Sequence, residues 1–153
     1  MLSTLFRRPY LAFTVASLLT VLVAVLHTLG LTGKPPDATW ADAYDSMRQA
    51  SVAAGPFEFT LYEVLESVWI QVGVLLVLLA LSNLVTLVAA PEDARRSVVR
   101  ALSALHGAFY ILLAAFFWYY RIPPPLLSFA LLAVAFGVAW LAAGRSSSTV
   151  SGT

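Results

Sequence analysis

Hydrophobic positions along the chain gather into four long stretches that contain no Asp, Glu, Lys or Arg: residues 9–33, 67–91, 101–120 and 122–144. Each stretch is about as long as the roughly 20 residues that a helix needs to cross a bilayer. Because lipid offers the backbone no hydrogen-bond partners, a spanning segment has to close its own hydrogen bonds, as a helix does. The pattern therefore predicts an all-α integral membrane protein, a left-handed four-helix bundle with spans at about 9–30, 64–90, 98–120 and 125–144.

Composition places most of the chain inside this bundle. Of its 153 residues, 60% are hydrophobic and 11% are charged, whereas roughly 25% are charged in an average soluble domain. The spans leave room for one membrane domain at 1–145 and a small polar tail at 146–153, which we expect to be disordered. Arg7 and Arg8 suggest the start of a signal peptide, but the length of the first span favours an uncleaved anchor.

Charge and residue types exclude several functions. The net charge of +1 comes with no basic run, so nucleic acid is not an expected partner. The absence of cysteine excludes thiol redox chemistry and thiolate-bound metals. His27 and His106 lie at depths about 15 Å apart by helix rise, too far to share a haem, and no H-x-x-x-H or E-x-x-H pair is present for a metal. The sequence therefore predicts no metal site and no cofactor.

Basic residues flank the spans unevenly. One side of the membrane receives Arg7, Arg8, Arg95, Arg96, Arg100 and Arg145, and the other receives Lys34, Arg48 and Arg121. The positive-inside rule makes the first side cytoplasmic, so both termini are expected inside. The expected location is a bacterial inner membrane or a plasma membrane.

The one long connection, residues 31–62, is expected outside and is acidic. Pro35-Pro36 followed by Asp37 as N-cap predicts a helix start, and Gly55-Pro56 predicts its stop. Trp40 and Tyr44 share one face of this helix, which is typical of a short amphipathic helix at the membrane surface. We interpret this helix as an interfacial anchor, with a lid over a pocket as the alternative.

Polar groups within spans are costly and mark candidate sites. His27, near the outer end of the first span, shares its level with Glu66 of the second and Arg121 after the third. A carboxylate beside a histidine suits acid or base chemistry, and aromatic residues gather at the same boundary. Candidates for an outward-facing pocket for a hydrophobic small molecule are His27, Glu63, Glu66, Trp69, Tyr110, Trp118 and Arg121. In the alternative, the polar side chains snorkel to the headgroups and the aromatics form an interfacial belt.

A second polar layer is expected on the cytoplasmic half, where Asn83 and His106 share a level. They predict one interhelical hydrogen bond worth about 1 kcal/mol or less. Small residues on the same helix faces, such as Gly73, predict close helix packing. Ser103 with His106 could also suit a hydrolase, but the G-x-S-x-G motif is absent.

The layout of the chain resembles a known group of proteins. His27 and Gly30 close the first span in V-L-H-T-L-G, Met47 lies in the outer segment, glutamates open the second span and prolines form a tight corner before the fourth. This plan resembles the small four-span inner-membrane proteins of bacteria and is similar in topology to the DoxX-like group. The resemblance covers nearly the whole chain and implies a four-span topology without assigning site residues.

These features favour a non-catalytic integral membrane protein whose partner is a membrane lipid, a partner membrane protein or a second copy of the chain, bound through small-residue and aromatic surfaces. The alternative is a small membrane enzyme or carrier that uses His27 and Glu66. An oligomeric channel would need a polar stripe through the whole bilayer, and Ala114 and Phe117 interrupt the best stripe, on the third span.

Overall fold

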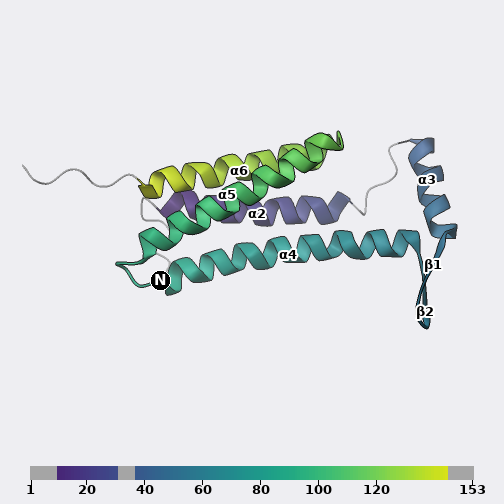
Figure 1. Ribbon diagram of the computed structural model, residues 1–153, viewed down its shortest axis with the longest axis horizontal. Coiled ribbons are helices and arrows are strands. Elements are labelled where there is room, and N and C mark those ends of the chain that lie inside the picture. The colour runs from purple at the N-terminus through teal and green to yellow at the C-terminus, as the bar shows by residue number, and fades with distance from the viewer. Residues whose placement is uncertain (1–9, 31–36, 145–153) are drawn as a thin grey trace, which may run out of the picture. The chain divides into compact units, whose positions relative to one another are not determined.

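The computed structural model describes residues 10–30 and 37–144, which form five helices and a two-stranded β-hairpin (Figure 1). In chain order the elements are α2 (Tyr10–Gly30), α3 (Ala38–Gln49), β1 (Ser51–Ala54), β2 (Phe57–Thr60), α4 (Leu61–Ala89), α5 (Arg95–Tyr119) and α6 (Pro123–Gly144). The expected tail at 146–153 and the Pro35-Pro36 pair lie outside the described residues.

Four of these helices, α2, α4, α5 and α6, are long and apolar enough to cross a membrane. They contain 21, 29, 25 and 22 residues, and each begins and ends within three residues of an expected span. Large apolar side chains such as Leu75, Val85 and Leu112 stay exposed along them, as they do on surfaces that face lipid. The all-α fold is therefore confirmed, and the chain is an integral membrane protein.

The described residues divide into two compact units that share α2 and α4. Unit 1 contains residues 10–21 of α2, residues 79–89 of α4, and the whole of α5 and α6. Unit 2 contains residues 22–30 of α2, α3, the hairpin, and residues 61–78 of α4.

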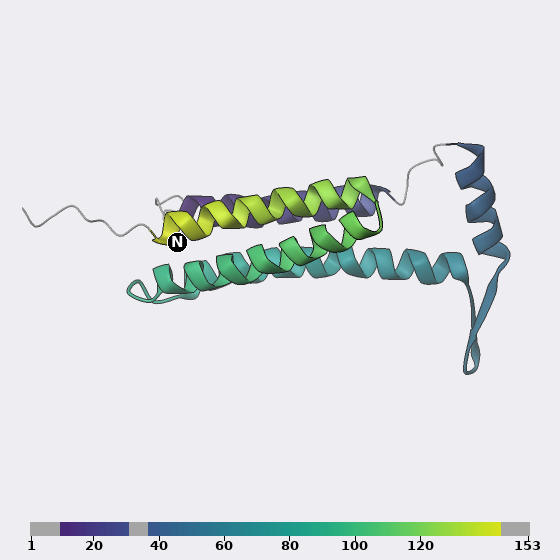
Figure 2. The ribbon, with the colours of Figure 1, turned by 45° about the horizontal axis from the view of Figure 1, so that its top comes forward.

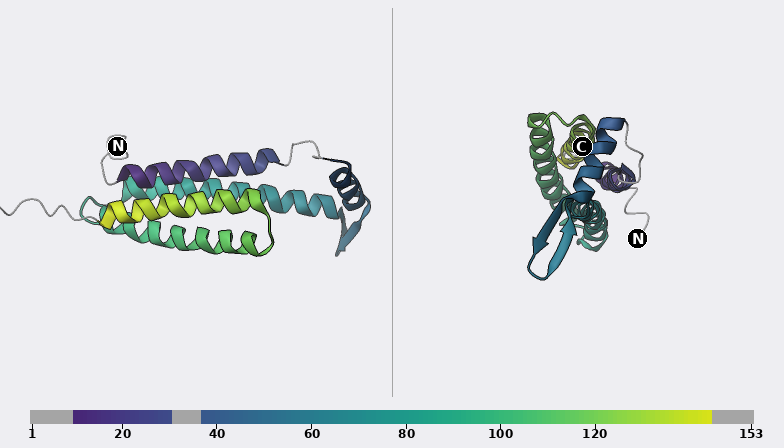
Figure 3. Two further views of the ribbon diagram at one scale, coloured as in Figure 1. Left: turned by 90° about the horizontal axis from the view of Figure 1, so that it is seen from above. Right: turned by 90° about the vertical axis from the view of Figure 1, so that its right-hand side faces the viewer.

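Aromatic side chains form the centre of unit 1. Helices α5 and α6 run side by side as an antiparallel pair (Figures 2 and 3). Phe136 of α6 meets Phe13 of α2 edge-on, with ring centroids 5.9 Å apart, and stacks on Tyr110 of α5 at 5.7 Å. All three rings are fully buried. Burial of such large rings supplies much of the packing energy of a core, so this cluster holds three helices together.

Arginines at one end of unit 1 donate hydrogen bonds to backbone oxygens at the C-terminal ends of α4 and α6. Arg95 donates to the backbone oxygen of Ala90 just after α4, at 2.8 Å, and Arg96 donates to that of Ala143 near the end of α6, at 2.7 Å. Positive charge near a helix C-terminus is favourable because the last carbonyls carry partial negative charge. The basic residues that indicated the cytoplasmic side thus also satisfy backbone groups that the helices leave open.

The turn between α5 and α6 uses a left-handed residue. Arg121 has φ of 55°; its N–H bonds to Trp118 O at 3.1 Å, and the N–H of Ile122 bonds to Phe117 O at 3.0 Å. This pair of hydrogen bonds is the Schellman motif, in which glycine is the usual left-handed residue. Helix α6 then begins at Pro123, where the missing N–H costs nothing because first-turn N–H groups have no partner in the helix.

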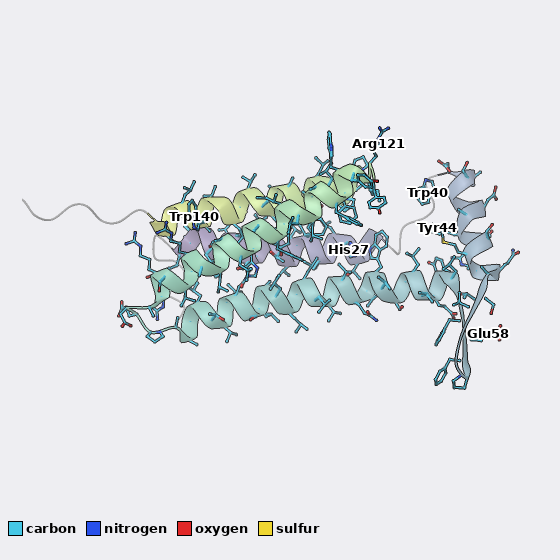
Figure 4. All side chains as sticks on the ribbon, in the orientation of Figure 1. His27, Trp40, Tyr44, Glu58, Arg121 and Trp140 are labelled. Atoms are coloured by element: carbon cyan, nitrogen blue, oxygen red, sulfur yellow. The ribbon has the colours of Figure 1, made fainter. Side chains whose placement is uncertain are left out.

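Helix α3 in unit 2 begins as expected at its N-cap. The Asp37 carboxylate accepts a 3.0 Å hydrogen bond from the N–H of Trp40, which satisfies one of the open N–H groups of the first turn. Trp40 and Tyr44 project from the same side of α3 (Figure 4), and Tyr44 meets Tyr62 of α4 with ring centroids 5.8 Å apart. Arg48 adds a cation–π contact over the Tyr62 ring at 4.5 Å. These contacts dock α3 on the start of α4.

The expected helix stop at Gly55-Pro56 is wrong, because α3 ends at Gln49 and these two residues form the turn of a β-hairpin. Residues 51–54 pair antiparallel with 57–60. Gly55 adopts φ of 62°, the positive value that a two-residue hairpin turn with glycine first requires. Valine, phenylalanine and threonine on either side favour strands over helix.

Helix α4 follows β2 without a linker and starts with a capping box. The N–H of Thr60 donates to Glu63 Oε2 at 2.8 Å, and the N–H of Glu63 donates to Thr60 Oγ1 at 3.1 Å. This reciprocal pair satisfies two backbone N–H groups that the helix leaves open. Leu61 N also donates to Ala50 O at 2.8 Å, so the base of the hairpin is closed onto the helix start.

The α5–α6 turn supplies a test of backbone strain. Replacing Arg121 by Gly should give a protein more stable than Arg121→Ala by about 1 kcal/mol, because only glycine adopts the left-handed region without steric cost. Titration with sodium dodecyl sulfate, followed by circular dichroism, measures the difference. Equal stability of the two variants would contradict the left-handed turn.

Candidate functional site

The deeper of the two expected polar layers lies inside unit 1, between α4 and α5. Asn83 Oδ1 and His106 Nε2 are 2.8 Å apart, and both side chains are buried. A carbonyl oxygen only accepts hydrogen bonds, so Nε2 of His106 carries the proton and donates it. The imidazole ring also meets Phe136 of α6 edge-on at 5.0 Å. The pair therefore ties α4 to α5 within an apolar core.

Other polar atoms in the same core are buried without a hydrogen-bond partner. Among the described residues of unit 1 they include the hydroxyl oxygens Ser17 Oγ and Ser103 Oγ. A buried polar atom that makes no hydrogen bond costs free energy rather than supplying it. These hydroxyls therefore contrast with the bonded pair, and their removal should cost little.

The expected outer layer includes a ring stack in unit 2 near the C-terminal end of α2, where Figure 4 labels His27. His27 lies on Trp69 of α4 with ring centroids 4.7 Å apart and ring planes within 18°. Trp69 Nε1 donates a 2.8 Å hydrogen bond to the backbone oxygen of His27. The Nε2 atom of His27 is buried and has no hydrogen-bond partner. The stack thus fixes the imidazole ring in a position where its Nε2 atom is buried without a partner.

Glu66 lies close to the His27–Trp69 stack. Its side chain lines a small cavity of about 30 Å³ together with Trp69 and Tyr62. A cavity of this size accepts a water-sized molecule but not a larger ligand. His27 Nε2 has no hydrogen-bond partner, so it makes no hydrogen bond to Glu66. Trp69 is the neighbour that the two residues share.

Glu63 is exposed and its carboxylate is used at the start of α4, where it binds the N–H and hydroxyl of Thr60. The expectation that Glu63 lines a pocket missed this role. The signal was present in the sequence, because T-L-Y-E matches the S/T-x-x-E pattern of a capping box.

An apolar groove of about 380 Å³ opens between α2 and α4 within unit 2. The two helices approach closely beside it, because a Cβ at Gly73 would lie only 2.5 Å from Thr28 Oγ1. The Thr28 hydroxyl already donates to Ala24 O at 3.0 Å, so the groove makes no polar demand on a ligand. The lining residues are Ala24, Val25, Thr28, Leu29, Gly73, Val74, Val77 and Leu78. Sequence reasoning treated Ala24 and Gly73 as packing residues and missed the groove.

The groove and the ring stack are neighbours along both helices. Thr28 follows His27 directly on α2, and Gly73 lies one helical turn beyond Trp69 on α4. The apolar groove thus adjoins His27, an imidazole whose Nε2 atom has no hydrogen-bond partner. This combination suits a molecule with a long apolar part and a polar end.

The remaining expected pocket residues belong to unit 1. Tyr110 is fully buried between Phe129 and Phe136, whereas Trp118 and Arg121 are exposed at the end of α5. Exposed aromatics in this segment, which include Phe116, Tyr119 and Tyr120, are typical of a membrane-interface belt. The candidate site is therefore built from His27, Trp69, Glu66 and the groove of unit 2.

The described part of the chain, residues 10–30 and 37–144, contains no group of three His, Cys, Asp or Glu side chains placed to hold a metal ion.

The bonded pair and the unpaired hydroxyls give a matched test. In a double-mutant cycle, Asn83→Leu and His106→Leu should couple by about 1 kcal/mol, the scale of hydrogen bonds between transmembrane helices. The free energy of unfolding in detergent, measured by dodecyl sulfate titration, gives the coupling.

Ser103→Ala is the control on the same face of α5. Because its hydroxyl has no partner, its loss should leave stability nearly unchanged. Additive effects of the two leucine substitutions would show that the Asn83–His106 bond contributes nothing.

Comparison with protein-family models, with curated proteins and with solved structures finds no match for this chain.

Proposed function

We propose that the protein is a non-catalytic membrane protein that binds a lipid, with an acyl chain in the groove between α2 and α4. The observation that carries the proposal is the groove itself, with a volume of about 380 Å³, within the roughly 300–1,000 Å³ of typical small-molecule sites. Its walls belong to two membrane-length helices. The molecules that reach such walls in a bilayer are lipids and the helices of other membrane proteins.

The position of the polar groups supports a lipid over a purely apolar ligand. His27 lies next to a groove residue, Thr28, and its buried Nε2 lacks a partner. A headgroup phosphate or hydroxyl is a suitable partner for that nitrogen. Trp69 holds the imidazole in place through the ring stack and its hydrogen bond to the backbone.

A second candidate is a small enzyme or carrier that acts at His27 and Glu66 on a hydrophobic molecule. The unpartnered His27 Nε2 favours it as well, because a fixed imidazole whose ring nitrogen makes no hydrogen bond within the protein suits proton transfer. Such a function needs Glu66 or the substrate to reach that nitrogen. A helix of a partner membrane protein, or of a second copy of the chain, is a further occupant of the same groove.

We further propose that both termini are cytoplasmic, that α3 and the hairpin lie outside, and that the membrane is a bacterial inner membrane or a plasma membrane. The six-to-three distribution of basic residues supports this orientation. We also propose that the chain shares its four-span topology with the DoxX-like group.

Filling the groove tests lipid binding. Val74→Phe adds a ring to the groove wall and should lower the fraction of protein that retains lipid by about tenfold, equivalent to about 1.4 kcal/mol of binding free energy. Native mass spectrometry after reconstitution with phosphatidylethanolamine and phosphatidylglycerol measures that fraction. His27→Ala in the same assay should weaken retention without abolishing it.

Val85→Phe is the matched control, since Val85 is an exposed valine of α4 outside the groove. It should retain lipid as the unmodified protein does. Full retention by Val74→Phe would contradict the proposal, and a second chain bound in place of lipid would favour the partner alternative.

The absence of cysteine allows the orientation to be tested with single-cysteine variants. A membrane-impermeant maleimide should label Ser46→Cys on α3 in intact cells, but Asp93→Cys, between α4 and α5, only after permeabilisation. Both positions are exposed, so accessibility depends on the side of the membrane. The reverse pattern would place the termini outside.

A further inference from the structure

The β-hairpin of unit 2 has one apolar face that its own unit leaves uncovered. Val52 of β1 lies directly opposite Phe59 of β2, and directly opposite residues share a face of an antiparallel pair. Phe57 is two residues from Phe59 and therefore on the same face, with ring centroids 6.2 Å apart. The exposed fractions of Val52, Phe57 and Phe59 are 41%, 63% and 41%.

The opposite face of the hairpin is polar. Ala53 pairs with Glu58, and Ser51 pairs with Thr60. The Ser51 hydroxyl donates a hydrogen bond to the Glu58 carboxylate across this face. The hairpin is thus amphipathic, with aromatic rings on one side and a carboxylate on the other. A lone two-stranded hairpin is marginally stable in water, so an apolar face of this kind calls for a covering medium.

The connection to α4 places the hairpin at the level of the lipid headgroups. Helix α4 has 29 residues, which corresponds to about 43 Å at a rise of about 1.5 Å per residue. This length matches the roughly 40–45 Å of a bilayer including both headgroup layers. Exposed apolar side chains continue to the first residue of the helix, Leu61, and include Val64 and Val68. The start of α4 therefore lies at the headgroup boundary.

The hairpin cannot move far from that boundary. Thr60 ends β2 and also caps α4, and the bond from Leu61 N to Ala50 O closes the hairpin base. The hairpin runs crosswise to α4 and projects past its side (Figures 1 and 2). A direction crosswise to a membrane-spanning helix lies along the membrane surface, so lipid is the neighbour beneath the hairpin.

Charge indicates how this contact is made. The described outer residues 37–60 carry Asp37, Asp42, Asp45 and Glu58 against Arg48. An acidic segment is not drawn to anionic lipid. Contact with the bilayer therefore depends on the apolar face, whose aromatic rings suit the boundary between headgroups and acyl chains.

We propose that the hairpin is an interfacial anchor, which inserts Val52, Phe57 and Phe59 into the outer leaflet of the membrane that α4 crosses while Glu58 faces water. Insertion covers the exposed apolar face and holds α3 and the start of α4 at a fixed height. Binding through apolar contact should be as strong in zwitterionic as in anionic lipid and insensitive to salt.

Spin labels on single cysteines test the insertion in the full-length protein. In phosphatidylcholine nanodiscs, labels at Phe57→Cys and Val52→Cys should show a ratio of oxygen to nickel-chelate accessibility several-fold higher than labels at the control positions. Oxygen concentrates in lipid and the nickel chelate in water, so the ratio reports depth. The controls are Glu58→Cys and Ala53→Cys, which lie on the polar face of the same hairpin.

Val52→Cys keeps both phenylalanines and shows whether loss of Phe57 has unfolded the hairpin. Equal ratios on the two faces would overturn the proposal. Protection of the apolar face from both reagents would also overturn it, because that result means a protein contact such as a second copy of the chain. The outcome is independent of lipid retention in the groove, which involves residues 24–29 and 73–78.

Discussion

The need to satisfy every backbone hydrogen bond in lipid governs this protein. Within the four membrane-length helices, the backbone hydrogen bonds of the helix itself meet this need. At the helix ends, individual side chains and backbone groups meet it. Thr60 and Glu63 close the start of α4, the Schellman bonds around Arg121 close α5, and Arg96 closes α6. Two residues that were candidates for chemistry take part in these closures. Glu63 does so through its carboxylate, and Arg121 does so through its backbone N–H.

With the backbone satisfied, the few polar side chains inside the spans fall into two kinds. Asn83 Oδ1 and His106 Nε2 bond to each other and connect α4 to α5. The hydroxyls of Ser17 and Ser103 are buried without partners. In an apolar medium the first kind specifies which helix faces meet, whereas the second kind lowers stability. The core of unit 1 is therefore held by its aromatic cluster and by one hydrogen-bonded pair.

Unit 2 is organised differently, because its helices meet through small residues and leave a groove. Gly73 allows Thr28 to approach closely, and the hollow beside this contact is apolar along its length. The His27–Trp69 stack next to it along the two helices contains a fixed imidazole whose Nε2 atom is buried without a partner. The acidic helix α3 and the amphipathic hairpin lie in the same unit. Lipid is the environment that matches the exposed apolar surfaces of both the groove and the hairpin.

The sequence by itself determined the membrane class, the four helices and the N-cap at Asp37, because uncharged length and capping chemistry are local properties. It also placed Asn83 and His106 at one depth, since helix rise is regular. The capping box at Glu63 was also readable as T-L-Y-E, although Glu63 was a candidate for the pocket. Only the tertiary structure decided that the segment around Gly55-Pro56 pairs as a hairpin and that His27 stacks on Trp69. The groove beside Gly73 was decided there too. These features depend on which side chains meet across elements, and hydrophobic periodicity within one element does not encode those contacts.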